Sequence, residues 1–179
     1  GESRYILLNH MRCNKQDFPM MVERYAALAY DPQNVPTHEQ LPLLNYPHLS
    51  AEKPSPGLIL KLHLKLDRPL LALGCGANYG PAKLWPVEYF AQVCDYWVKK
   101  GGAILALGTK SDLKTVASIK TQLQKATLPY FYDIAGKTNL TEVIDLVAAC
   151  TAAVCNDSGL MHTVAAVDVP QICIFGSTS

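Results

Sequence analysis

From residue 69 onward, the chain alternates short apolar segments with longer segments whose apolar positions recur at helical spacing. This alternation is typical of a parallel sheet covered by helices, because each helix carries the chain back to begin the next strand in the same direction. We expect strands at residues 70–73, 103–107, 130–134, 152–155 and 171–175, with helices at about 87–100, 112–125, 140–149 and 159–167. The pattern predicts a Rossmann-like α/β fold, doubly wound, with helices on both faces of a parallel sheet.

Two of the expected helices carry an apolar stripe. The first stripe consists of Phe90, Val93, Cys94 and Trp97, and the stripe of the third helix consists of Leu140, Val143, Ile144 and Val147. Residues at this spacing lie on one face of a helix. We predict that both stripes are core positions that pack on the sheet and take no part in chemistry.

Composition and charge exclude several classes of protein. Apolar residues make up 49% of the 179 residues and charged residues 17%, which is typical of a packed globular interior. The formal net charge is only +1, so we predict no nucleic-acid partner. No apolar run approaches the roughly 20 residues of a membrane-spanning helix, and no signal pattern is present, so we predict a cytoplasmic protein.

The sequence offers no pattern for a bound metal or cofactor. The six cysteines are widely spread, with no C-x-x-C pair and no histidine at zinc-ligand spacing. There is also no Asp-x-Asp pair that would hold a divalent ion on a nucleotide sugar. We therefore predict metal-independent chemistry and no cofactor.

Residues 1–68 differ from the rest of the chain. They contain a strand-like segment at residues 5–8, one amphipathic helix at about 19–30, a proline-rich segment at 32–56 and a short helix that runs to about residue 66. We predict that 1–68 is the tail of another domain plus a linker, and that 69–179 is a truncated C-terminal domain. The chain is expected to be a fragment, with sequence missing at both ends.

A glycine-rich segment follows the first expected strand. Residues 74–80 match a G-x-G-x-x-x-G pattern, which raises the alternative of NAD(P) binding. Pro81 and Pro86 oppose it, because they delay the helix that should begin within the glycine segment. We favour a loop that presents backbone N–H groups and Lys83 to a phosphate. A solvated loop lysine is the other interpretation of Lys83.

Polar segments also follow the second and third expected strands. Asp112 could accept a hydrogen bond from a sugar hydroxyl or could cap the next helix, and both interpretations remain open. Residues 136–139 either border a base or ribose or merely form a turn. The carboxyl ends of parallel strands share one edge of a sheet, so these loops are expected to lie close together.

The segment Asn156–His162 joins the fourth expected strand to a helix. It directs the N–H groups and the positive dipole end of that helix at one place, where anions bind. His162 falls one turn beyond Ser158 on the same face. Because no G-x-S-x-G elbow surrounds Ser158, we expect a diphosphate site rather than a covalent nucleophile. A well-capped helix without a ligand is the alternative.

Three of these segments together resemble glycosyltransferase family 9. The resemblance is carried by residues 75–86, 156–162 and 175–178, and it extends to residues 1–5 and 21–25. It implies a GT-B fold, in which two Rossmann-like domains face a cleft and the second holds the nucleotide sugar. Residues 69–179 would be most of that second domain.

The resemblance also implies roles for individual residues. Lys83 would meet the phosphates of the donor, and Asp112 would meet its ribose. The diphosphate and sugar region would be lined by Asp157, Ser158, Gly159, Leu160 and His162, and the glycine-rich loop would contribute Gly76 and Tyr79.

The reaction implied by the family is an inverting transfer without metal. It moves L-glycero-D-manno-heptose from ADP-heptose to the inner-core heptose of lipopolysaccharide in Gram-negative bacteria, with peripheral contact at the inner membrane through the acceptor. Such a displacement needs a general base. The family's candidate base is an aspartate near the start of the first domain, outside this sequence, so the fragment alone is predicted to be inactive.

Three positions depart from the family pattern. Cys75 stands where a proline is common, Asn78 where an acidic residue is common, and Leu84 where a basic residue is common. These departures leave a second hypothesis, a non-catalytic Rossmann-like module for nucleotide binding or protein interaction.

Overall fold

The computed structural model describes residues 17–31, 34, 36–42, 46–76 and 83–176. The chain forms two compact units, Gly1–Pro47 and His48–Ser179. The strand expected at residues 5–8 lies outside the described residues.

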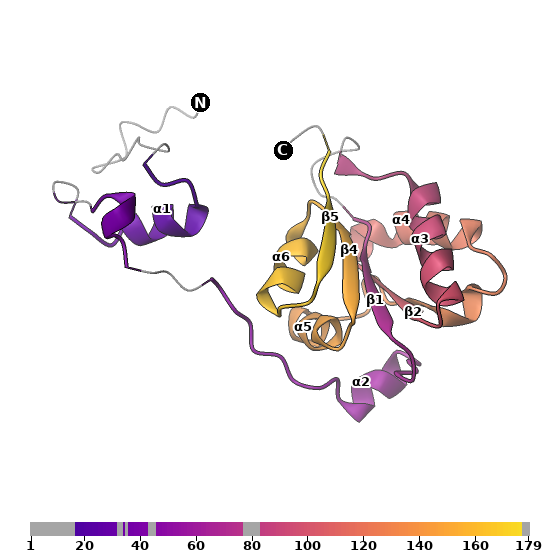
Figure 1. The fold of residues 1–179 in the computed structure, drawn as a ribbon. Coiled ribbons are helices and arrows are strands. Elements are labelled where there is room, and N and C mark those ends of the chain that lie inside the picture. The colour runs from indigo at the N-terminus through magenta and orange to yellow at the C-terminus, as the bar shows by residue number, and fades with distance from the viewer. Residues whose placement is uncertain (1–16, 32–33, 35, 43–45, 77–82, 177–179) are drawn as a thin grey trace. The chain divides into compact units, whose positions relative to one another are not determined.

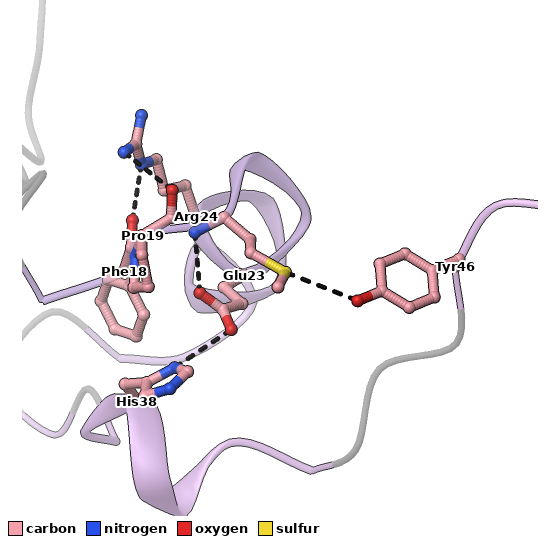
Figure 2. A network of polar contacts seen from close by, with 7 residues as sticks. Phe18, Pro19, Glu23, Arg24, His38 and Tyr46 are labelled. Carbon is pink, nitrogen blue, oxygen red and sulfur yellow. Dashed lines mark hydrogen bonds and ion pairs between the residues drawn. The ribbon is translucent and has the colours of Figure 1, made fainter. Parts of the chain in front are cut away.

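In the first unit, the expected amphipathic helix is present but short. Helix α1 spans Met21–Ala27, and the 3₁₀ turn η2 spans His38–Gln40. The buried carboxylate of Glu23 accepts the N–H of Met20 at 2.9 Å and lies 3.0 Å from Nδ1 of His38 (Figure 2). Glu23 therefore ties the start of α1 to η2.

The second unit is built on five parallel strands in the order β3-β2-β1-β4-β5. Figure 1 shows β2, β1, β4 and β5 of this sheet side by side. The strands are β1 Leu70–Gly74, β2 Ala103–Leu107, β3 Phe131–Asp133, β4 Ala152–Asn156 and β5 Gln171–Ile174. Every residue of β1 and β2 is buried, as expected for strands covered on both faces. The strand order reverses between β1 and β4, which makes this point the topological switch of the sheet.

Helices cover both faces of the sheet, as predicted. The long helices are α3 Val87–Lys99, α4 Leu113–Gln122, α5 Leu140–Ala148 and α6 Gly159–Ala166. Leu71, Leu73 and Ile104 pack with α3 and α4, whereas Leu70 and Leu105 pack with α5 and α6. Successive strand residues point to opposite faces, so each strand serves both cores.

The segment that precedes β1 packs on the same unit. Helix α2, Pro56–Lys61, begins at Ser55, whose hydroxyl accepts the N–H of Leu58 at 3.2 Å. It ends earlier than expected, and His63 follows with a left-handed φ of 52°. Upstream, the N–H of Leu49 donates to the carbonyl of Ala166 at 2.7 Å. The compact unit therefore includes the residues from His48 to the first strand.

Candidate functional site

The loops that follow β1, β2, β3 and β4 converge on a pocket of about 560 Å³ at the carboxyl edge of the sheet. Open α/β sheets bind ligands at this edge, beside the switch point. Its wall is formed by Gly74, Gly76, Leu107, Gly108, Thr109, Lys110, Asp112, Gly136, Thr138, Asn139, Leu140, Val143, Ser158, Gly159, Leu160 and Thr163. Five of the predicted site residues are therefore brought together, namely Gly76, Asp112, Ser158, Gly159 and Leu160.

Asp112 holds the turn after β2 and packs against two glycines. Its Oδ2 accepts the backbone N–H of Thr109 at 2.7 Å and the hydroxyl of Thr109 at 2.9 Å. A Cβ at Gly76 would lie 2.3 Å from Oδ1 of Asp112, and a Cβ at Gly108 would lie 2.9 Å from Oδ2. Asp112 directly precedes α4, but its side chain makes no capping hydrogen bond to that helix; it holds the start of the 3₁₀ turn Lys110–Asp112 instead. Its contact with a ribose stays a prediction.

The loops after β2 and β3 are joined to each other. The N–H of Gly136 donates to the carbonyl of Gly108 at 2.8 Å, and Gly136 has a left-handed φ of 68°. A Cβ at Gly136 would lie 3.1 Å from Cγ of Lys110, so the stem of this lysine passes close to the glycine. Lys110 is a cation in the pocket wall that the sequence interpretation did not single out. Its position after an expected strand was the only available signal.

The start of α5 forms an apolar part of the wall. Asn139 caps the helix: its Oδ1 accepts the N–H of Glu142 at 2.9 Å, and its own N–H donates to Glu142 at 2.8 Å. This backbone hydrogen bond, followed by the ion pair with Lys61, lowers the pKa of Glu142. The prediction that Leu140 is a core residue was wrong, because its side chain is 69% exposed. Leu140 is the first residue of α5 and lies at the carboxyl edge of the sheet. There it lines the pocket instead of packing in the core.

The start of α6 forms another part of the wall. Ser158 is the N-cap residue in an extended conformation, and its hydroxyl makes no capping hydrogen bond. Gly159 is exposed, and a Cβ built on it would meet nothing within 4 Å. The backbone N–H groups of this first turn and the helix dipole favour a negatively charged ligand at this end of the pocket.

Lys83 and Asp157 form an ion pair beside this helix start. Nζ of Lys83 lies 2.5 Å from Oδ2 of Asp157, the residue that precedes Ser158. Neither residue is part of the pocket wall, and His162 is exposed on α6 outside it. The predicted phosphate contacts of these three residues stay predictions. Tyr79 lies outside the described residues.

One buried polar residue of the predicted anion-binding segment was given no role of its own. Asn156 ends β4 with no exposed surface, and its Nδ2 donates to the carbonyl of Cys75 at 2.8 Å. Its Oδ1 accepts the backbone N–H of Trp85 at 3.3 Å. The available signal was a polar residue directly after an apolar strand.

The thiols near the site are poor nucleophiles. Burial raises the pKa of Cys75 to about 12, with a further contribution from Asp112, and burial raises the pKa of Cys155 to about 12 as well. Both thiols stay protonated at neutral pH. Within the described ranges, no group of three or more His, Cys, Asp or Glu residues is arranged to hold a metal ion. Among the helices of those same ranges, none combines the length and apolarity needed to cross a membrane.

The parallel sheet and the pocket at its switch point define a Rossmann-like α/β domain with a ligand pocket at the carboxyl edge of its strands. The model of glycosyltransferase family 9 (heptosyltransferase) matches residues 1–179, and the chain belongs to this family. The match confirms the family that the three sequence segments predicted.

Within the family, the chain is similar to heptosyltransferase II. Lipooligosaccharide heptosyltransferase 2 of Haemophilus influenzae is 42% identical over 184 residues, which cover 100% of this chain and 53% of the relative. Lipopolysaccharide heptosyltransferase 2 of Escherichia coli is 36% identical over 182 residues, covering 100% of this chain and 52% of the relative. The chain spans about half the length of the curated relatives it matches.

A solved structure confirms the predicted fold class. The structure of E. coli ADP-heptose LPS heptosyltransferase II matches with a TM-score of 0.88 and 36% identity, over 98% of this chain and 54% of that chain. The Rossmann-like sheet described above therefore has the fold of the corresponding part of that structure, in agreement with the predicted GT-B fold class.

Proposed function

We propose that this protein transfers heptose from ADP-heptose to the inner-core heptose of lipopolysaccharide, and that the pocket at the carboxyl edge of the sheet holds the ADP part of the donor. In this proposal, residues 69–179 are the donor-binding domain, and residues 1–68 are the end of the first domain plus a linker. The names of the relatives support the donor and the acceptor.

The observation that carries the proposal is that the pocket wall combines two kinds of surface. It includes the start of α6, with Ser158 and Gly159, which suits an anion. It also includes the exposed Leu140 and the half-buried Val143, which suit the face of a base. A nucleoside diphosphate needs both, because it carries charge on its phosphates and an apolar face on its ring.

The reaction requires the charge that develops on the departing ADP to be stabilised. Dipoles and cations that are already in place at the leaving group lower the barrier most effectively. The start of α6 and Lys83, held beside it by Asp157, are suited to this role. Lys110 adds a second cation in the pocket wall. The general base that the acceptor hydroxyl needs is assigned to none of the described residues.

The setting of the reaction belongs to the same proposal. Relatives named for lipopolysaccharide and lipooligosaccharide support an acceptor that carries a lipid part. We propose that the protein works on the cytoplasmic side and contacts the membrane peripherally through that acceptor.

The test uses the full-length protein, ADP-heptose and a lipopolysaccharide truncated to one inner-core heptose. Mass spectrometry should detect the addition of one heptose, and calorimetry should detect ADP binding that Lys83→Ala weakens. Lys120→Ala, on the exposed face of α4, is the matched control and should bind ADP as the wild type does. ADP binding without transfer would favour the non-catalytic module, and absence of both would refute the proposal.

A further inference from the structure

Asn156 connects two segments of the chain that lie on either side of residues 77–82. Cys75 comes directly after β1, and Trp85 comes shortly before α3. The side chain of Asn156 donates to the carbonyl of Cys75 at 2.8 Å and accepts the N–H of Trp85 at 3.3 Å. Since β4 pairs with β1, this contact crosses the topological switch of the sheet.

The contact requires an amide side chain of this length. One end of the amide must donate and the other must accept, because one partner is a carbonyl and the other an N–H. The side chain of Asn156 and its bond to Cys75 are fully buried, so loss of that bond would leave a backbone carbonyl without water. The bond to Trp85 is partly buried. The ring of Trp85 also packs edge-on against the ring of Phe90, with 5.0 Å between the ring centroids, and this contact anchors the same segment to α3.

The segment that Asn156 holds is the one that carries Lys83. Lys83 lies two positions before Trp85, and its Nζ bonds to Asp157, the neighbour of Asn156. Two successive residues of the β4–α6 connection therefore contact this segment, one through its backbone and one through its lysine. Asn156 itself is no part of the pocket wall, so it would not touch a ligand there.

We propose that Asn156 is a positioning residue, which sets the place of Lys83 beside the start of α6 by holding the backbone at Cys75 and Trp85. The inference rests on the proposed function, because it assigns Lys83 to the donor diphosphate. We assign the main effect of Asn156 on the ligand to Lys83; its bond to Cys75 also adjoins Gly76 of the pocket wall. Most of its contribution to ADP binding should therefore disappear when Lys83 is absent.

The test compares Asn156→Ser and Asn156→Leu in the full-length protein by calorimetry with ADP. Loss of the two hydrogen bonds is expected to weaken ADP binding about tenfold in the wild-type background. In the Lys83→Ala background, the same substitutions should change ADP binding by less than about twofold. Trp97→Phe is the matched control: it removes one side-chain bond to the backbone, from Nε1 to the carbonyl of Pro69, at the other end of β1.

A second measurement keeps the inference independent of ADP. Hydrogen exchange at the amide of Trp85 should be slow in the wild type and at least tenfold faster in Asn156→Ser, because the shorter serine side chain does not reach this amide. If Asn156→Leu does not fold, the exchange rates of the wild type and Asn156→Ser still test whether Asn156 holds the backbone at Trp85. Unchanged exchange at Trp85, or an equal loss of ADP binding with and without Lys83, would overturn the inference. If wild-type protein does not bind ADP while the exchange rates behave as expected, the proposed function fails and the positioning of Lys83 stands.

Discussion

Nζ of Lys83 lies 2.5 Å from Oδ2 of Asp157, although the two residues are 74 positions apart in the chain. Their side chains are only 16% and 24% exposed. An ion pair that is largely removed from water is screened little by salt. The pair thereby couples the segment after β1 to the segment after β4.

We expect this coupling to be measurable in stability. In a double-mutant cycle of Lys83→Ala and Asp157→Ala, urea unfolding should give a coupling energy of about 0.5–3 kcal/mol. The more exposed pair Lys61–Glu142 is the control, and its coupling should be smaller. A coupling for Lys83 and Asp157 no larger than that of the control would contradict this expectation.

Gly76→Ala should disturb the pocket through Asp112. The added Cβ would lie 2.3 Å from Oδ1 of Asp112, so the carboxylate or the backbone must move. We expect a loss of stability of about 1–3 kcal/mol, as for other overpacked sites, and weaker ADP binding. Gly57→Ala, where a Cβ meets nothing within 4 Å, should leave both unchanged or raise the stability slightly. Thermal unfolding and calorimetry with ADP decide between these outcomes.

Leu140→Ala should separate ligand binding from stability. The side chain is 69% exposed, so its removal should change the free energy of unfolding by less than about 0.5 kcal/mol. ADP binding should weaken, because an apolar face for the base is lost. Leu146→Ala, on the same helix but fully buried, should lower the stability by about 2–5 kcal/mol. Unchanged ADP binding in Leu140→Ala would remove this residue from the proposed base site.

The pH dependence of stability should reveal the cap of α5. The pKa of Glu142 is lowered from 4.5, first by the N–H of Asn139 and then by Lys61, so its charged form is favoured in the folded state. The contribution of the charged Glu142 to the free energy of unfolding is fully present above pH 4.5, its pKa in the unfolded chain. This contribution is lost as the pH falls through the lower pKa that Glu142 has in the folded state. Glu142→Gln should therefore differ from the wild type most at neutral pH, and the difference should shrink at acid pH. Thermal unfolding between pH 7 and pH 3 tests this, and a difference independent of pH would contradict it.

Alkylation should rank the thiols by burial. The pKa of Cys75, Cys94, Cys150 and Cys155 is raised to about 12 by burial, so little thiolate exists at neutral pH. Cys173 also has a raised pKa but is only half-buried. Among these five, iodoacetamide should modify Cys173 first, and faster as the pH rises. Peptide mass spectrometry gives the order, and earlier modification of Cys75 would show that its loop opens.

Some features of the site followed directly from local sequence, and others did not. The strand before Asn156 and the helix from Gly159 were predictable, because an apolar run and a capping segment act on neighbouring residues. Leu140 was misjudged, because its spacing matches the buried stripe of α5 while its exposure depends on where the sheet ends. The partner of Asn156 was equally hidden, because Cys75 is 81 positions away.

The sequence by itself determined the order of strands and helices, the parallel class of the sheet and the family, because periodicity and short motifs are properties of adjacent residues. Only the tertiary structure decided that β4 lies beside β1, that Asp112 packs on Gly76, and that Lys83 meets Asp157. These relationships depend on which strands become neighbours, and that choice is made by packing between distant parts of the chain.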